Sequence, residues 1–135
     1  MYRLGYRYEW ELTRKLRLNG LAAVRIAGSG KSVDAPDIIA GYRGHVVSIQ
    51  VKTTRGETLY ISEEDMNSLI GFSKLLGSEP WFYVVYRGRR LSLLVKPEVF
   101  ERTNRGVKLT FEKAREEGIS VSEFASVIKA KACTT

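Results

Sequence analysis

A carboxylate, an amide and a lysine occur at a spacing that can place them side by side. Asp37 opens one β-rich run, Gln50 and Lys52 close the next, and a glycine-rich turn at residues 41–44 connects the two runs. Side chains alternate across a strand, so Gln50 and Lys52 share one face, where Asp37 meets them from the partner strand. An acid facing X-Val-Lys on the next strand is typical of a metal-dependent phosphodiesterase site. The position two before the lysine is normally Glu or Asp in such a site, and here it is Gln50.

The oxygen atoms near this hairpin suit a hard divalent cation. Phosphodiester hydrolysis needs an activated water and stabilisation of negative charge, and a bound metal ion supplies both. Mg²⁺ prefers oxygen ligands, which Glu9, Asp37, the side chain of Gln50 and the backbone carbonyl of Val51 can provide. Lys52 can orient the attacking water or neutralise developing charge. The alternative for Lys52 is a surface lysine that pairs with Asp37.

The first helix must bring Glu9 to the hairpin. Leucine and tyrosine at four-residue intervals predict a helix over residues 4–18, which ends at Asn19-Gly20. Glu9 lies at the edge of its apolar stripe, and Gly5, one turn earlier, lacks a side chain and lets a large ligand approach. The alternative is an ordinary amphipathic helix with Glu9 on its surface.

Positive charge is concentrated in the N-terminal part of the chain. The 135 residues include 22 Lys and Arg against 15 Asp and Glu, a net charge of +7. This charge favours a nucleic acid or an anionic membrane surface as partner, and a solvated basic surface without a polyanion ligand is the alternative. The segment 28–32 resembles a phosphate loop but has the wrong glycine spacing. Ser29 and Lys31 within it suit contacts to a nucleic-acid phosphate.

Length and composition predict a single domain, residues 1–135, in the cytoplasm. The chain is long enough for one core. It contains no apolar run that could span a bilayer and no signal-peptide core. One cysteine, Cys133, excludes an intrachain disulfide, and with only His45 beside it a Cys/His zinc site is excluded as well.

Further elements follow from apolar periodicity and capping residues. We expect an α/β fold with a mixed central β-sheet flanked by helices. Strands are expected at residues 21–27, 38–40, 46–51, 59–61, 80–86 and 91–95, with an edge strand at 107–111 and a polar connection at 53–57. Helices are expected after the capping residues Ser62 and Ser120.

Four motifs in this order resemble the archaeal Holliday junction resolvases of the PD-(D/E)xK nuclease superfamily. They are Gly5-x-x-x-Glu9, Arg25-x-Ala27-Gly28-Ser29, Pro36-Asp37-Ile38-Ile39-Ala40 and Gln50-Val51-Lys52. The likeness covers roughly the first three-quarters of the chain. It implies a restriction-endonuclease-like fold and a homodimer that cuts four-way DNA junctions with Mg²⁺, or alternatively Mn²⁺.

The resemblance also implies roles for individual residues. It implies Glu9, Asp37 and Lys52 as catalytic residues, Ser29 as an accessory residue of the active site, and Arg25 with the neighbouring basic loop as DNA contacts. Together with the chemistry of the hairpin and the basic charge, this gives three expected sets: at the catalytic site Glu9, Ser29, Asp37, Gln50 and Lys52; as metal ligands Glu9, Asp37, Gln50 and the Val51 carbonyl; as DNA-binding residues Arg14, Arg25, Ser29, Lys31 and Arg55.

Gln50 stands where the resembled family carries a metal-binding Glu. Gln has nearly the shape of Glu and keeps one oxygen, but it lacks the negative charge. An introduced inactivating substitution, a natural variant that still cuts, and a relative that binds junctions without cutting are three open explanations. The sequence therefore predicts either a structure-selective endonuclease or a DNA-binding module of the same fold. RNA or membrane binding is a third alternative that leaves Asp37 and Lys52 unexplained.

Overall fold

The computed structural model describes residues 4–26 and 35–134, and these residues alternate between helices and strands. The helices are α1 (Leu4–Leu18), α2 (Glu63–Leu76), α3 (Phe111–Glu117) and α4 (Val121–Cys133). The strands are β1 (Ala22–Arg25), β2 (Ile38–Tyr42), β3 (His45–Thr54), β4 (Thr58–Ser62), β5 (Glu79–Tyr86), β6 (Leu91–Val95), β7 (Glu101–Arg102) and β8 (Gly106–Thr110). Short 3₁₀ turns lie at Arg87–Arg89 and Pro97–Val99.

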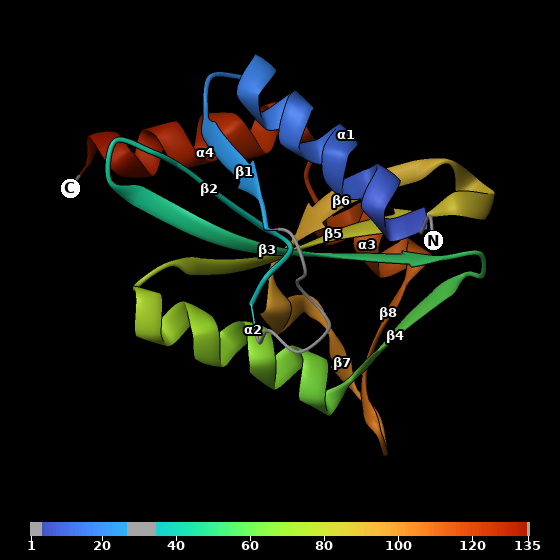
Figure 1. Cartoon of the computed structure of the whole chain (residues 1–135). Helices are drawn as coiled ribbons and strands as arrows, with labels where there is room; N and C mark the ends of the chain where they lie inside the picture. The colour runs from blue at the N-terminus through green and yellow to red at the C-terminus, as the bar shows by residue number, and fades with distance from the viewer. Residues whose placement is uncertain (1–3, 27–34, 135) are drawn as a thin grey trace.

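A five-stranded sheet in the order β1-β2-β3-β5-β6 forms the centre of the fold. All its neighbours are antiparallel except β3 and β5, which run parallel because β4 and α2 carry the chain back across the sheet. Helices α1 and α4 cover one face and α2 covers the other, with the small sheet β4-β8-β7 beside it (Figure 1). The predicted mixed sheet flanked by helices is confirmed. None of the described helices is both long and apolar enough to cross a membrane.

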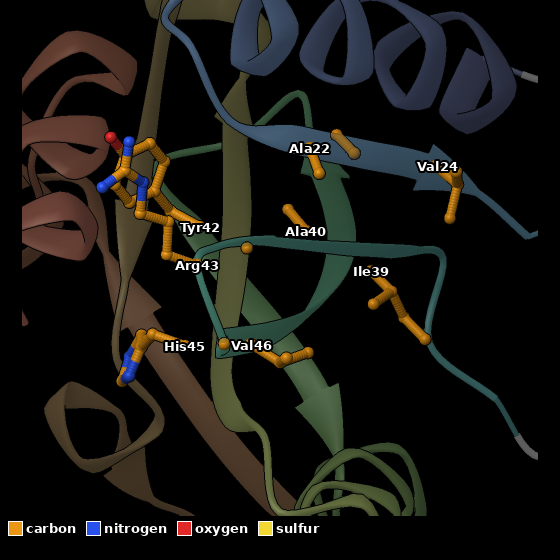
Figure 2. Close-up of a pocket in the computed structure, with 11 residues that line it drawn as sticks. Ala22, Val24, Ile39, Ala40, Tyr42, Arg43, His45 and Val46 are labelled. Carbon is orange, nitrogen blue, oxygen red and sulfur yellow. The ribbon is translucent and has the colours of Figure 1, made fainter. Parts of the chain in front are cut away.

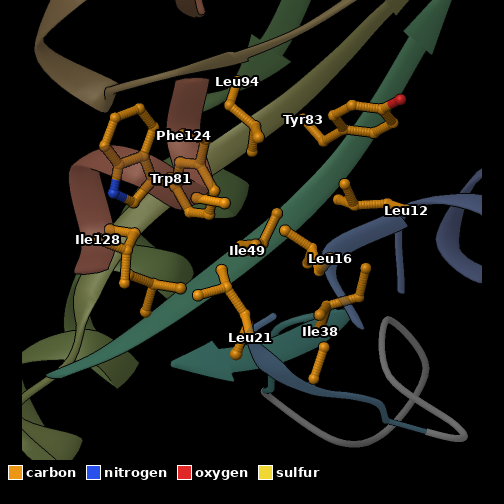
Figure 3. Close-up of a cluster of buried hydrophobic side chains, with 14 of the residues drawn as sticks. Leu12, Leu16, Leu21, Ile38, Ile49, Trp81, Tyr83, Leu94, Phe124 and Ile128 are labelled. Atoms are coloured by element: carbon orange, nitrogen blue, oxygen red, sulfur yellow. The ribbon is translucent and has the colours of Figure 1, made fainter. Parts of the chain in front are cut away.

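Two hydrophobic cores lie on the two faces of this sheet. The core under α1 and α4 contains Leu12, Leu16, Ile49 and Phe124, all fully buried (Figure 3). The core under α2 is formed by other side chains, including Met66, Leu69, Phe82, Val84 and Tyr86. Successive residues of β5 enter opposite cores, which explains why this strand is a continuous apolar run. Each such buried side chain contributes about 1.5–3 kcal/mol of transfer free energy.

The β2–β3 hairpin fixes the register on which the candidate site depends. Arg43 and Gly44 at its tip have φ angles of 45° and 93°, the positive values that a tight two-residue hairpin turn requires. Gly41 belongs to β2 rather than to the turn, and a Cβ there would lie 2.5 Å from the His45 carbonyl oxygen. The resulting register pairs Ile38 with Ile49.

Several predicted boundaries need correction. Residues 53 and 54 continue β3 instead of starting a polar connection, because they pair with Val85 and Tyr86 of β5. The predicted edge strand at residues 107–111 is wrong: β8 lies between β4 and β7, and Phe111 begins α3 after the cap at Thr110. The predicted strand at 21–27 is confirmed as β1, and Ala27 lies outside the described residues.

The helix ends follow the capping chemistry of the sequence. Leu4–Leu18 is helical as predicted, and Gly20 ends that helix with a φ of 88°. The hydroxyl of Ser62 accepts a hydrogen bond from the Asp65 N–H at 3.0 Å, and that of Ser120 accepts one from the Glu123 N–H at 3.1 Å. Gly77 ends α2 in the left-handed conformation.

Glu79 ties three elements together at one end of the sheet. Its carboxylate accepts hydrogen bonds from His45 Nε2 at 2.9 Å and from Lys131 Nζ at 2.8 Å, which joins the hairpin, β5 and α4. Burial raises the pKa of Glu79, but the hydrogen bonds from Lys131 and His45 and the charges of Lys131 and Lys96 outweigh it and hold the pKa below its ordinary value.

We therefore expect Glu79 to contribute to acid unfolding. A lowered pKa gives stability that is complete above the ordinary glutamate pKa and is lost as pH falls through the lower folded value. Glu79→Gln should lower the unfolding free energy at pH 7 by about 1–2 kcal/mol and flatten its decline in acid. Urea unfolding between pH 7 and pH 3 measures both effects. The exposed Glu57, paired with Arg89, is the control, and Glu57→Gln should change stability at pH 7 little. Equal losses in the two variants would contradict the prediction.

Candidate active site

Asp37 lies where β2 begins, held against the edge of β3. Its N–H donates to the Ile49 carbonyl at 3.1 Å, and its Oδ2 accepts a hydrogen bond from the Val51 N–H at 2.8 Å. Because Ile38 pairs with Ile49, Asp37 stands opposite Gln50, as the sequence predicted. The side chain is buried, with 5% of its residue surface exposed. One hydrogen bond therefore fixes the backbone of Asp37 and the other fixes its carboxylate.

The alternation expected along β3 is confirmed. Ile49 and Val51 are buried in the core under α1 and α4, whereas Gln50 and Lys52 are partly exposed. In the parallel ladder Gln50 and Lys52 pair with Phe82 and Val84 of β5, which enter the core under α2. The amide and the ammonium therefore belong to the α2 face of the sheet.

Val51 directs its backbone toward Asp37. The Val51 N–H already donates to the Asp37 carboxylate. The N–H and C=O of one strand residue point toward the same neighbouring strand, so the Val51 carbonyl is directed to the edge that Asp37 occupies. This orientation agrees with the ligand role that the sequence suggested for that carbonyl.

Lys52 is paired with a residue that the sequence did not single out. Its Nζ lies 2.5 Å from Oδ2 of Asp65, in the first turn of α2. Asp65 was expected only as part of a helix cap, and its N–H does bond to Ser62. Its closeness to Lys52 depends on how α2 packs across β3, and no local pattern in the sequence encodes that packing. The ion pair that the structure shows for Lys52 is with Asp65, whereas the alternative suggested from the sequence was a pair with Asp37.

Glu9 and Arg25 form an ion pair on the α1 side of the sheet. Arg25 Nη1 lies 3.1 Å from Glu9 Oε1, and both side chains are mostly buried, with exposures of 16% and 14%. Glu9, predicted at the edge of the apolar stripe, is therefore mostly buried. The guanidinium also lies over the rings of Tyr6 and Trp10, with its carbon 4.4 Å and 5.2 Å from the two ring centroids. Neither ring was singled out from the sequence.

The backbone connects this ion pair to Asp37. Arg25 pairs with Ile38 in the β1–β2 ladder, and the Ile26 N–H donates to the Asp37 carbonyl at 2.8 Å. Glu9 and Arg25 thus approach the start of β2 from the α1 side, while Gln50 and Lys52 approach it from the α2 side. The candidate site is therefore centred on Asp37, at the residue that precedes β2.

The donor atoms have the chemistry that Mg²⁺ requires, with Gln50 at the position where such sites normally have a carboxylate. Glu9, Asp37, the Gln50 amide and the Val51 carbonyl offer oxygen atoms only, which suits a hard cation. Residues 4–26 and 35–134 contain no group of three or more Asp, Glu, His or Cys placed to hold a metal ion. Of the four predicted ligand residues, Glu9 and Asp37 are acids, whereas Gln50 offers a neutral amide and Val51 a backbone carbonyl.

The predicted DNA-binding residues are spread over several elements. Arg14 is exposed on α1, and Arg55 is exposed at the turn between β3 and β4. Ser29, Lys31 and the whole segment 28–32 lie outside the described residues. Among these predicted DNA-binding residues, Arg25 is the one that the described part of the chain shows in an ion pair with Glu9.

A separate apolar hollow of about 390 Å³ lies over β1, β2 and the start of β3 (Figure 2). Its lining includes Val24, Ile39, Tyr42 and Val46, but not Asp37, Gln50 or Lys52. The hollow is therefore distinct from the candidate site, although Ile39 stands only two residues beyond Asp37 on β2.

Comparison with known proteins identifies the family. Residues 1–133 match the profile described as archaeal Holliday junction resolvase (Hjc). The crossover junction endodeoxyribonuclease Hjc of Methanocaldococcus jannaschii is 40% identical over 90 residues, which cover 67% of this chain and 65% of that protein. The protein of the same name from Archaeoglobus fulgidus is 33% identical over 123 residues, covering 90% of this chain and 88% of that one.

Solved structures agree with this match. The structure of A. fulgidus Hjc, described as a Holliday junction resolvase from an archaeal hyperthermophile, superposes with a TM-score of 0.80 at 29% identity and covers 90% of this chain and 99% of that chain. A bacterial homing endonuclease shares the fold, with a TM-score of 0.57 at 12% identity, over 100% of this chain and 99% of its own. The predicted restriction-endonuclease-like fold is confirmed, and the chain belongs to the archaeal Holliday junction resolvase family.

Proposed function

We propose that this chain is a structure-selective endonuclease that resolves four-way DNA junctions in the cytoplasm by metal-dependent phosphodiester hydrolysis. The observation that carries this proposal is the position of Asp37. Its carboxylate is fixed by the Val51 N–H, opposite Gln50 and close in the ladder to Lys52. Relatives named crossover junction endodeoxyribonuclease support the same reaction class.

Mg²⁺, or Mn²⁺ in its place, is the proposed cofactor. Asp37, the Gln50 amide oxygen, the Val51 carbonyl and Glu9 would hold it, and when bound it would activate water and stabilise charge on the phosphate. Asp37 is preorganised for this role by its two backbone contacts. Glu9 forms an ion pair with Arg25, so whether its carboxylate can bind a metal ion depends on the position of that guanidinium.

Lys52 would act on the phosphate side of the site. Asp65 holds its ammonium on the α2 face, partly exposed, where it can meet a phosphate oxygen or orient the attacking water. Asp65 is thus proposed as a positioning residue, because it contacts Lys52 and is not needed as a metal ligand.

Branched double-stranded DNA is the proposed partner, bound by a homodimer. The net charge of +7 and the exposed Arg14 and Arg55 favour a polyanion, and Ser29 and Lys31 are proposed to add phosphate contacts. A four-way junction offers two symmetry-related strands for paired cuts, and one chain of 135 residues supplies one candidate site. A two-fold dimer matches this symmetry.

A junction-binding protein that does not cut is the second candidate function. Gln50 favours it, because a neutral amide binds Mg²⁺ more weakly than a carboxylate does. The remaining acids, Asp37 and Glu9, carry two charges, and Arg25 offsets one of them. The two candidate functions differ in cleavage and not in DNA binding.

Asp37→Asn is expected to abolish cleavage while junction binding stays nearly unchanged. The asparagine oxygen can still accept the Val51 N–H, so the hairpin should be retained, whereas the negative charge toward the metal is lost. Gel-shift assays in calcium and cleavage assays in magnesium measure the two properties separately. Glu64→Gln, an exposed carboxylate in the first turn of α2, is the control and should change neither. If binding fell in step with cleavage, Asp37 would not have this role.

Gln50→Glu is expected to raise the cleavage rate roughly 10²-fold or more, because it restores a charged metal ligand. In metal-free buffer the same change should weaken junction binding slightly, since it adds a negative charge facing phosphates. Single-turnover cleavage of a labelled junction measures the rate. An already fast parent protein that gains nothing would show that Gln50 is not a metal ligand. A variant that binds metal and junction but cuts nothing would favour the binding protein.

The chain is expected to be a dimer at micromolar concentration in light-scattering measurements. The exposed leucines that end α2, Leu75 and Leu76, are proposed as part of the interface, because exposed apolar side chains of this size favour burial. Leu75→Glu should therefore weaken the dimer. Leu18→Glu, at another exposed leucine, on α1, is the control. A monomer in the presence of junction DNA would contradict the dimer. If Leu75→Glu left the dimer unaffected, Leu75 would not be part of the interface.

A further inference from the structure

Two aromatic side chains on α1 are left exposed beside the candidate site. Tyr6 and Trp10 lie one helical turn apart with 40% and 46% of their surface accessible, and their rings meet edge to face at 6.3 Å. The opposite side of the same helix buries Leu12 and Leu16 completely. The two rings lie outside the buried core of this helix, and the part of their aromatic surface that stays exposed is available to a ligand.

Arg25 holds the two rings in place. Its guanidinium carbon lies within 4.4 Å of the Tyr6 centroid and 5.2 Å of the Trp10 centroid, and Glu9 fixes the guanidinium through the ion pair at 3.1 Å. A cation against an aromatic ring is attracted by the ring's negative face. The rings are thus preorganised, so little conformational freedom is lost when a flat ligand stacks on them.

The surroundings of the rings suit a nucleic-acid strand. A Cβ at Gly5, next to Tyr6, would meet no atom within 4 Å, so the helix backbone is open to close approach there. Arg14, one turn after Trp10, is exposed and can meet a phosphate. Aromatic side chains within a basic surface are the usual means of binding unpaired nucleotides without reading their sequence.

We propose that Tyr6, Trp10 and Arg25 form a stacking site for a nucleobase that leaves the duplex at the branch point. This inference rests on the proposed function, since it places the base next to Glu9 and the scissile strand. Two rings are too small a surface for a stable protein interface, which buries about 20–30 residues on each side. An unpaired base, with a flat face of similar size to an indole, matches the site.

The matched variants are Trp10→Leu, which keeps an apolar side chain without a ring, and Trp10→Phe, which keeps a ring. Their affinities are measured in calcium for a four-way junction, a linear duplex and a junction with one unpaired nucleotide at the branch point. Trp10→Leu should lower the affinity for both junctions roughly tenfold or more and the affinity for the duplex much less, because stacking on one aromatic residue contributes this much binding energy per base. Trp10→Phe should retain most of the affinity. Leu18→Ala, exposed on the same helix, should change nothing.

The salt dependence separates stacking from a structural role. Trp10→Leu removes no phosphate contact, so the slope of log affinity against log salt should be unchanged. A flatter slope, with equal losses on junction and duplex, would mean that Trp10 only positions Arg25 and would overturn the proposal. Unchanged affinity in Trp10→Leu would overturn it as well, and so would a Trp10→Leu protein that becomes monomeric. Circular dichroism verifies that each variant is folded.

Tryptophan fluorescence tests the site independently of junction recognition. The chain has two tryptophans, and Trp81 is only 3% exposed, so a change on adding DNA reports on Trp10. A single-stranded oligonucleotide should quench the parent protein, and Trp10→Phe should abolish that change. If the unmutated protein bound a four-way junction no more tightly than a linear duplex, the proposed function would be contradicted. Absence of quenching by single-stranded DNA contradicts the stacking site.

Discussion

Strand β3 is the constraint on which the rest of the structure depends. It pairs antiparallel with β2 along one edge and parallel with β5 along the other, so its position is fixed from both sides. Its side chains divide between the two cores, and the same alternation that buries Ile49 and Val51 sends Gln50 and Lys52 to the opposite face. A shift of one residue would exchange these faces, burying an amide and an ammonium. The same register of β3 is therefore required both for packing of the core and for the geometry of the candidate site.

The charged groups around the candidate site are largely paired within the chain. Lys52 is held by Asp65 and Arg25 by Glu9, so each of these two cations has an acid from a helix beside it. These pairs reduce repulsion among like charges in a basic protein. They also mean that a phosphate must compete with a carboxylate for each cation. A phosphate that binds Arg25 or Lys52 would weaken its ion pair with Glu9 or Asp65, which links DNA binding to the electrostatic surroundings of the site.

Sequence reasoning was most successful where the interactions are local. The bounds of α1, the caps at Ser62 and Ser120 and the hairpin that sets Asp37 opposite Gln50 all follow from residues close together in the chain. The pairing of Lys52 with Asp65 and the stacking of Arg25 on Tyr6 and Trp10 could not be predicted, because they depend on how a helix packs against a distant strand. The strand β8 was misplaced for the same reason: its partner β4 lies far away in the sequence.

The division between local and distant pairing has a consequence for the order of assembly. The β2–β3 hairpin closes over a two-residue turn, and such short-range contacts form quickly. The parallel pairing of β3 with β5 requires the chain to complete β4 and α2 first and is slow by comparison. Asp37 and Gln50 should therefore acquire their relative register early, before Lys52 meets Asp65. On this ordering, amide hydrogens of the hairpin would gain protection from solvent exchange ahead of those in α2. Asp37 would then be in place in a folding chain in which Lys52 has not yet paired with Asp65.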